Sequence, residues 1–319
     1  MKIAVVLFNL GGPDSVESVE PFLYNLFCDP DIFNLPFGQK LFAKLISSRR
    51  APKVAGEYKL IGGKSPINEW TEKQRSMLEI NLHKDYKSLD VYTAMRYWNP
   101  LTANIVDKVE SKNYDKIILL PLYPHYSITT TGSSFNEWNR HYKGDKSKLF
   151  FVNDYYINQK YLEAINQRID ETILRFPEKV ESEIQIVFSA HGTPVSLVKK
   201  GDPYSNHIKQ TVEAVMKFRK HSHNHHLCFQ SKVGPMKWLE PATAKMIEEL
   251  ASQNKKNLLI VPISFVSDHV ETLFELDIEY RHVAEKVGIE NYIVMKGLND
   301  SDLFIEALSN LVKEKLNEQ

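Results

Sequence analysis

Two short motifs bring histidine and carboxylate side chains to the ends of predicted strands. The first, FSAHGTP at 188–194, carries His191, and the second, SDHVE at 267–271, carries His269 and Glu271. Each motif follows a short apolar run that is typical of a buried strand. Ligands bind at the carboxyl ends of strands in open α/β sheets, so we expect these side chains to converge there. Imidazole and carboxylate groups bind borderline divalent metals and transfer protons, so the motifs predict metal or proton chemistry.

His191 also has a purely structural interpretation. A single histidine after a strand is often only a hydrogen-bonded structural residue. Here Gly192 and Pro194 follow it, and these residue types predict a tight turn that projects the imidazole from the strand end. The residues alone leave both interpretations open.

Glu271 likewise has two interpretations. Asp268 followed three residues later by Glu271 is a capping-box pattern, in which the carboxylate only closes a helix N-terminus. Glu275 and Glu279 continue the series at four-residue spacing, and like charges at this spacing destabilise a helix by about 0.2–0.5 kcal/mol per pair. An acidic row beside His269 would suit the passage of a cation or of protons.

The rest of the chain alternates predicted strands with predicted amphipathic helices. Short apolar runs predict strands at 3–9, 90–95, 117–121, 149–153, 184–189, 227–230, 258–263 and 292–295. Helical patterns include 101–109, 158–176, 208–218 and 303–312. This alternation predicts an α/β fold of parallel sheets covered by helices.

The chain also resembles itself weakly. Residues 5–13 are similar to 185–194, and 119–123 are similar to 260–264. Both pairs are separated by a little over half the chain. We therefore expect two similar α/β halves that meet near residue 155, with the cleft between them as the binding site.

Composition excludes several classes of protein. Lys plus Arg total 40 and Asp plus Glu total 40, so the formal net charge is zero and nothing indicates nucleic-acid binding. Cys28 and Cys228 are the only cysteines, too few for a disulfide framework, and they predict reduced thiols in a cytosolic protein. No apolar run approaches the length of a membrane span.

Other patterns have weaker claims to function. GGKS at 62–65 resembles the end of a P-loop, but Tyr58 stands where that pattern requires glycine, which excludes a nucleotide site. The absence of a G-x-S-x-G elbow argues against a serine hydrolase. The histidine-rich segment 221–226 is predicted to be a solvated loop. Residues 33–45 predict a core helix, or else a lip over a large flat ligand whose rim carboxylates Arg49 and Arg50 would reach.

The chain resembles ferrochelatases over essentially its whole length. The matching motifs, in family order, are YPHYS and TGSS (123–127, 131–134), FSAH and GDPY (188–191, 201–204), QSKVGPM (230–236), and FVSDHVETL with ELDIEY (265–273, 275–280). The resemblance implies two Rossmann-like, chelatase-type halves. Residues 1–155 would form the first half, with a porphyrin-contacting lip, and 156–319 the second, with the residues that handle the metal and the protons. The last helix could pack back on the first half. The implied reaction is a lyase-type insertion of Fe²⁺ into protoporphyrin IX, the last step of protohaem synthesis.

The resemblance also implies roles for individual residues. His191 and Glu271 match the family's metal-site pair, and His269 matches the neighbouring catalytic histidine. The implied porphyrin-contacting positions are Leu10, Arg50, Tyr58, Ser65, Tyr123 and Phe265. Leu10 stands where the coproporphyrin-using branch carries an iron-ligating tyrosine, which favours protoporphyrin. We expect His191 to accept a pyrrole proton or to present iron, with His269 and Glu271 facing it and Glu275 further out.

The resemblance implies no cofactor beyond the Fe²⁺ substrate. The chain ends at Gln319 without a cysteine-bearing tail, so no iron–sulfur cluster is expected. No transit peptide is recognisable, which suits a cytoplasmic bacterial enzyme that touches the inner face of the membrane at most. Two alternatives remain: a sister chelatase for cobalt or nickel, since ligand softness does not separate these metals from Fe²⁺, and a non-catalytic metal or haem carrier.

Overall fold

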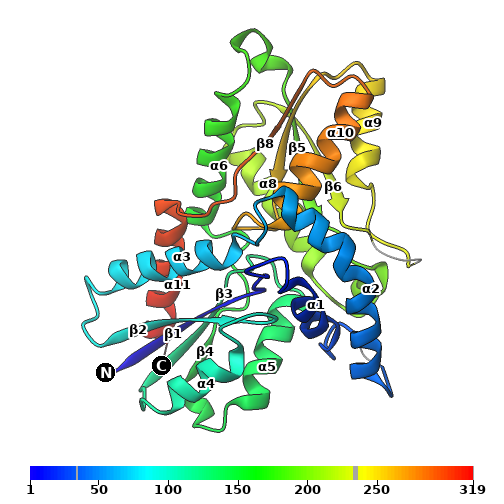
Figure 1. Ribbon diagram of the computed structural model, residues 1–319. Coiled ribbons are helices and arrows are strands. Elements are labelled where there is room, and N and C mark those ends of the chain that lie inside the picture. The colour runs from blue at the N-terminus through cyan, green and yellow to red at the C-terminus, as the bar shows by residue number, and fades with distance from the viewer. Residues whose placement is uncertain (34, 233–235, 319) are drawn as a thin grey trace. The chain divides into compact units, whose positions relative to one another are not determined.

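The computed structural model describes residues 1–33, 35–232 and 236–318, and it divides into two compact units (Figure 1). Unit 1 comprises Met1–Tyr155 and Asn299–Gln319, and unit 2 comprises Tyr156–Leu298. Residues 156–319 were predicted to form the second half, with a last helix free to pack back on the first half. The structure assigns that helix to unit 1.

Unit 1 is built on a four-stranded parallel sheet in the order β2-β1-β3-β4. Its strands are β1 (Ile3–Asn9), β2 (Leu89–Met95), β3 (Lys116–Pro121) and β4 (Leu149–Phe151). Its helices are α1 (Val19–Phe27), α2 (Gln39–Leu60), α3 (Ile67–Leu82), α4 (Thr102–Glu110), α5 (Ser133–His141) and α11 (Asp302–Asn317), with the short π-helix η1 (Ile128–Gly132) and 3₁₀-helix η2 (Lys146–Lys148). Every residue of β1 is buried, as expected for a central strand covered on both faces.

Helices cover both faces of this sheet. Phe8 of β1 packs edge-on against Phe135 and Trp138 of α5, with ring centroids 5.9 Å apart in each pair, and α4 completes that core. Helices α3 and α11 contact each other and the β2 and β3 strands (Figure 1). This two-sided cover leaves the carboxyl edge of the sheet, and the loops that follow its strands, to carry function.

Unit 2 repeats the plan, with a parallel sheet in the order β6-β5-β7-β8. Its strands are β5 (Gln185–His191), β6 (Asn224–Gln230), β7 (Asn257–Pro262) and β8 (Asn291–Val294). Its helices are α6 (Gln159–Ile173), α7 (Val195–Lys199), α8 (Tyr204–Phe218), α9 (Thr243–Ser252) and α10 (Tyr280–Lys286), with the 3₁₀-helix η3 (Glu178–Glu183) and the π-helix η4 (Glu271–Glu279). Val187, Cys228, Ile247 and Ile260 lie in one buried core between the sheet and its helices.

The two sheets have the same strand order within their units. The similar sequence segments occupy equivalent strands, because 5–13 and 185–194 overlap β1 and β5, and 119–123 and 260–264 overlap β3 and β7. The predicted α/β fold with two similar halves is therefore confirmed. All eight predicted strands lie within three residues of the observed ones.

Two local predictions were wrong in part. Strand β6 begins inside the segment predicted to be a loop, so His225 and His226 belong to the sheet, and the His225 ring packs edge-on against Phe188 at 6.3 Å between centroids. β6 is an edge strand, whose early positions are only partly covered and tolerate polar side chains. Residues 33–45 do not form a core helix either, because Phe37, which precedes α2, and Leu41 in its first turn are 91% and 77% exposed. Asn34 lies outside the described residues.

Among the described residues, none of the helices combines the length and the apolar character needed to cross a bilayer.

Candidate active site

His191 and Glu271 meet at the carboxyl edge of the unit 2 sheet. His191 is the last residue of β5, Glu271 is the first residue of η4, and His191 Nδ1 lies 2.8 Å from Glu271 Oε2. An ionised carboxylate only accepts hydrogen bonds, so Nδ1–H donates and the lone pair of a neutral ring lies on Nε2. The two side chains are 39% and 23% exposed, which leaves the pair open to solvent.

The structure favours pairing with His191 over the capping interpretation of Glu271. Val270 occupies the N-cap of η4 and makes no side-chain capping bond. Asp268 Oδ1 accepts hydrogen bonds from the Thr272 hydroxyl at 3.1 Å and from the Gly297 N–H at 3.0 Å. The Glu271 carboxylate is thereby left to pair with His191.

The two groups change each other's protonation. Desolvation lowers the pKa of His191, but the Glu271 charge and hydrogen bond outweigh it, so that this pKa is raised above its ordinary value. Burial raises the pKa of Glu271, but the facing His191 outweighs it, and the pKa of this carboxyl is held well below its usual range. The pair therefore favours an imidazolium beside a carboxylate.

His269 and Phe265 lie beside this pair. The Phe265 ring packs edge-on against both imidazoles, with centroids 6.2 Å from His191 and 4.4 Å from His269. His269 is buried and its Nδ1 donates to the Ser267 carbonyl at 3.1 Å. Burial lowers the pKa of His269, so it is the neutral histidine of the two.

Glu275 lies one step further along η4 and is surrounded by donors. It accepts hydrogen bonds from the Ser231 N–H at 2.7 Å, the Ser231 hydroxyl at 2.5 Å, the Tyr280 hydroxyl at 2.9 Å and the Gln230 amide at 3.2 Å. Burial and the Glu271 charge raise the pKa of Glu275 despite these donors.

Sequence reasoning gave Gln230 and Ser231 no role, although both belong to the QSKVGPM motif. The Ser231 hydroxyl also lies 3.4 Å from Glu271 Oε2, so it connects the two carboxylates. Ser231 has φ of +64°, a strained value for a serine. Residues 233–235 of this motif lie outside the described residues.

In unit 1, two of the predicted porphyrin-contacting residues follow strands. Leu10 directly follows β1, and its carbonyl accepts a hydrogen bond from the Tyr97 N–H at 3.0 Å. Tyr123 lies two residues after β3, and burial raises the pKa of its hydroxyl. Both therefore lie at the carboxyl edge of the unit 1 sheet.

The other predicted unit 1 contacts come from α2 and the loop after it. Arg50 is exposed and its guanidinium lies 5.7 Å from the centroid of the Phe27 ring, while Tyr58 on the same helix is buried. Ser65 is also buried, and its N–H donates to the Pro13 carbonyl at 2.8 Å.

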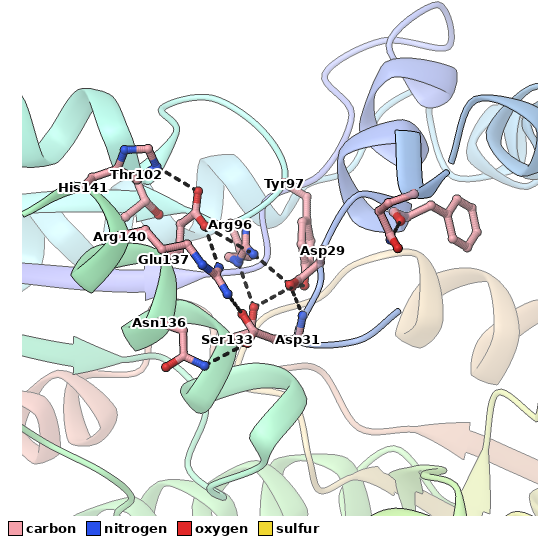
Figure 2. A network of polar contacts seen from close by, with 12 residues as sticks. Asp29, Asp31, Arg96, Tyr97, Thr102, Ser133, Asn136, Glu137, Arg140 and His141 are labelled. Atoms are coloured by element: carbon pink, nitrogen blue, oxygen red, sulfur yellow. Dashed lines mark hydrogen bonds and ion pairs between the residues drawn. The ribbon is translucent and has the colours of Figure 1, made fainter. Parts of the chain in front are cut away.

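A buried ion pair between Asp29 and Arg96 was not found by sequence reasoning (Figure 2). The Arg96 guanidinium lies 2.9 Å from Asp29 Oδ1, and the two side chains are 9% and 0% exposed. Asp29 also accepts hydrogen bonds from the Tyr97 hydroxyl at 2.6 Å and the Ser133 hydroxyl at 2.5 Å. Because Asp29 lies between α1 and α2, the pair ties the approach to α2 to the end of β2. The only sequence signal was the position of Arg96 directly after a predicted strand.

The described residues hold no cluster of three or more His, Cys, Asp or Glu side chains placed to bind a metal ion.

The family of the chain follows from comparison with known proteins. A family model described as Ferrochelatase matches residues 2–316. A ferrochelatase of Geotalea uraniireducens is 45% identical, covering 100% of this chain and 99% of its own length, and one of Aquifex aeolicus is 45% identical, covering 99% and 100%. The sirohydrochlorin chelatase SirB from Bacillus subtilis in complex with cobalt has a similar fold, with a TM-score of 0.53 at 10% identity over 99% of this chain and 95% of its own. The chain therefore belongs to the ferrochelatase family, metal chelatases of the lyase class that act in haem biosynthesis.

Proposed function

We propose that this protein inserts Fe²⁺ into protoporphyrin IX with release of two protons, and that His191 and Glu271 perform the insertion. The supporting observation is the hydrogen bond between His191 Nδ1 and Glu271 Oε2, which are 2.8 Å apart in two partly exposed side chains. The bond lies at the edge of the sheet where α/β proteins bind ligands. Insertion requires the loss of two pyrrole protons and the delivery of a metal to the ring. An imidazole held by a carboxylate can serve both needs.

His191 is suited to accept a pyrrole proton. With Nδ1–H donated to Glu271, the Nε2 lone pair of the neutral ring is available to substrate. The Glu271 charge stabilises the imidazolium that forms, as the raised pKa of His191 indicates. General-base catalysis of this kind typically contributes about 10²–10⁴-fold to a rate.

The donor set is also suited to a metal in transit. One imidazole and one carboxylate, without a thiolate, bind Fe²⁺ more weakly than a closed structural site with three or four ligands. Glu275 is held by Ser231, Gln230 and Tyr280, so it is less free than Glu271 to ligate iron, and its raised pKa suits it to take up a proton further from the porphyrin. No cofactor beyond the Fe²⁺ substrate, and no iron–sulfur cluster, is part of the proposal.

The porphyrin would be held by the residues that match family positions. We propose that Arg50 binds a rim carboxylate, because a guanidinium recognises carboxylates in a bidentate fork and Arg50 is exposed. The other proposed contacts with the porphyrin are those of Tyr58, Ser65, Tyr123 and Phe265. Leu10 cannot ligate iron, which supports protoporphyrin rather than coproporphyrin as the substrate. Peripheral binding energy of this kind can support about 1–5 kcal/mol of ring distortion.

We further propose a cytoplasmic enzyme that touches the membrane surface. The two cysteines are free, in keeping with a reducing compartment. Phe37, Leu41 and Leu45 are 91%, 77% and 63% exposed at successive four-residue steps into α2, and Lys40 and Lys44 lie among them. Apolar side chains flanked by lysines favour an anionic lipid surface. The protein should co-sediment with anionic vesicles, and charged substitutions at Phe37 and Leu41 should leave it in the supernatant.

The central test is anaerobic turnover. Protoporphyrin IX and coproporphyrin III are each supplied with Fe²⁺, Co²⁺ or Zn²⁺, and the porphyrin absorbance is followed. We expect many turnovers with Fe²⁺ and a higher kcat/KM for protoporphyrin. A stoichiometric complex without turnover would indicate a carrier, and turnover with Co²⁺ but never with Fe²⁺ would indicate a sister chelatase. Either result would refute the proposal.

A further inference from the structure

We propose that Tyr204 and Ser264 are positioning residues that fix the main chain of His191 and thereby aim its imidazole during metal insertion. The inference rests on the function proposed above, in which His191 acts on the porphyrin or the metal. It gives a role to the GDPY motif at 201–204, which no step of the proposed reaction uses.

His191 lies where β5 extends beyond its neighbour β7. The last paired residues of these strands are Ser189 and Pro262, and the Ile263 N–H donates to the Ser189 carbonyl at 3.1 Å. In a parallel ladder, the next residue that presents its N–H and C=O to the same neighbour is two positions further on. That residue is His191, and β7 has already ended there. Its main-chain groups must therefore find partners outside the sheet, or remain unpaired at a cost in free energy.

Two side-chain hydroxyls take the place of the missing strand. The His191 N–H donates to Ser264 Oγ at 2.9 Å, and the Tyr204 hydroxyl donates to the His191 carbonyl at 3.0 Å. These bonds come from different segments of unit 2, the turn after β7 and the start of α8. They hold the two main-chain groups of one residue at once.

The other side of the chain at this point is held by β6. His191 pairs with Gln230 in the ladder, and the Gly192 N–H donates to the Gln230 carbonyl at 2.8 Å. A Cβ at position 192 would lie 2.6 Å from that carbonyl oxygen, so the close approach requires glycine. With β6 on one side and two hydroxyls on the other, the main chain of His191 is held from both sides, which fixes the direction in which its side chain leaves the strand toward Glu271.

The GDPY motif explains how Tyr204 reaches this position. Gly201 has φ of +87°, which a residue with a side chain adopts only with strain. Asp202 Oδ1 accepts a hydrogen bond from the Tyr204 N–H at 2.9 Å, which satisfies one of the unpaired donors at the start of α8. Tyr204 is the first residue of α8 and its side chain is buried. The motif thus sets a helix start so that one hydroxyl meets one carbonyl.

The test uses variants that remove one hydroxyl each. Tyr204→Phe deletes the donor to the His191 carbonyl, and Ser264→Ala deletes the acceptor of its N–H. Ser264→Thr restores that acceptor. Tyr142→Phe is the matched control, because the Tyr142 hydroxyl also donates to a backbone carbonyl, that of Asp145 at 3.2 Å, from a buried ring in unit 1. For each protein, kcat and the KM values for protoporphyrin and Fe²⁺ are measured together with the unfolding temperature.

We expect Tyr204→Phe and Ser264→Ala each to lower kcat by about 10–100-fold, the range found when hydrogen-bond partners that orient a functional side chain are removed. The KM for protoporphyrin should stay within about twofold of the wild-type value. Ser264→Thr should recover most of the lost kcat, and Tyr142→Phe should keep it. The double variant should lose little more than either single variant, because both bonds hold one residue.

Several results would overturn the inference. They are a wild-type kcat in both Tyr204→Phe and Ser264→Ala, an equal loss of kcat in Tyr142→Phe, or no recovery in Ser264→Thr. Should Tyr204→Phe fail to fold, Ser264→Ala, which deletes one oxygen atom, decides alone. A wild-type protein that inserts no metal would sink the proposed function and this inference together, whereas active wild type with fully active variants would sink only the inference.

Discussion

Glu271→Gln separates the charge of this side chain from its shape. The amide can still accept a hydrogen bond from His191 Nδ1, but it carries no charge. A hydrogen bond to a charged group contributes about 1.5–3 kcal/mol and a neutral one about 0.5–1.5 kcal/mol. Because the side chains are 39% and 23% exposed, solvent screens the pair and the lower end of the difference, about 1 kcal/mol, applies. The ratio of protonated to neutral His191 should then fall roughly fivefold at a given pH.

The direction of the pH effect follows from the proposed role of His191. Glu271 raises the pKa of His191 in the wild type, so removing the charge lowers that pKa. A general base must be neutral, so activity is lost as the pH falls through its pKa. The acid limb of kcat/KM should therefore move to lower pH in Glu271→Gln. At the optimum, kcat should still fall by about 10–100-fold, because the imidazolium and the metal both lose their carboxylate partner.

The assay is the initial rate of anaerobic Fe²⁺ insertion across the pH range. Glu279→Gln is the matched control, since Glu279 is an exposed residue of the same π-helix. A wild-type acid limb with wild-type kcat in Glu271→Gln would refute the reasoning. An equal change in Glu279→Gln would show that helix charge, rather than contact with His191, controls the effect.

His191→Ala should lower insertion by about 10²–10⁴-fold while porphyrin binding, followed by fluorescence quenching, persists; near-normal turnover would remove the central assignment. Asp29→Ala should lower the free energy of unfolding by about 3 kcal/mol in urea titration, the lower end of the range for a broken buried pair, because the buried Arg96 guanidinium loses its nearer carboxylate but keeps the more distant Glu137 at 3.5 Å. The comparison is Asp85→Ala, which removes only an exposed ion pair and should leave the free energy of unfolding nearly unchanged; equal losses in the two variants would count against a buried ionic anchor.

Apolar runs carried most of the fold prediction. Strands such as β1 and β7 are buried along their whole length, so their hydropathy leaves no ambiguity about where they lie. The same signal failed at the start of β6, where edge positions accept histidines and the pattern looks like a loop. It also failed at 33–45, because the exposure of Phe37 and Leu41 is decided by what covers them rather than by their own type.

The site could be predicted only at its strand ends. His191 and Glu271 were found because each follows a predicted strand, but the choice between capping and pairing depended on Thr272 binding Asp268, a contact that periodicity does not reveal. A 3.6-residue period also could not show that η4 is a π-helix. The Ser231 and Ser264 bonds join residues 44 and 73 positions apart, and no local pattern indicates such contacts.

The hydrogen bond between His191 and Glu271 affects how these two side chains could bind and release a metal. Nε2 of His191 can bind a metal only when it carries no proton, so the raised pKa of His191 sets a cost on metal binding that grows as the pH falls. A resident site avoids this cost with more ligands and with outer hydrogen bonds that hold each ligand apart from the others. Here the carboxylate that would ligate iron is also the partner of the imidazolium, so taking up a pyrrole proton and releasing iron strengthen each other. If His191 and Glu271 act as proposed, the pair would give up its metal at the step where it gains a proton, and metal release would be coupled to deprotonation of the porphyrin.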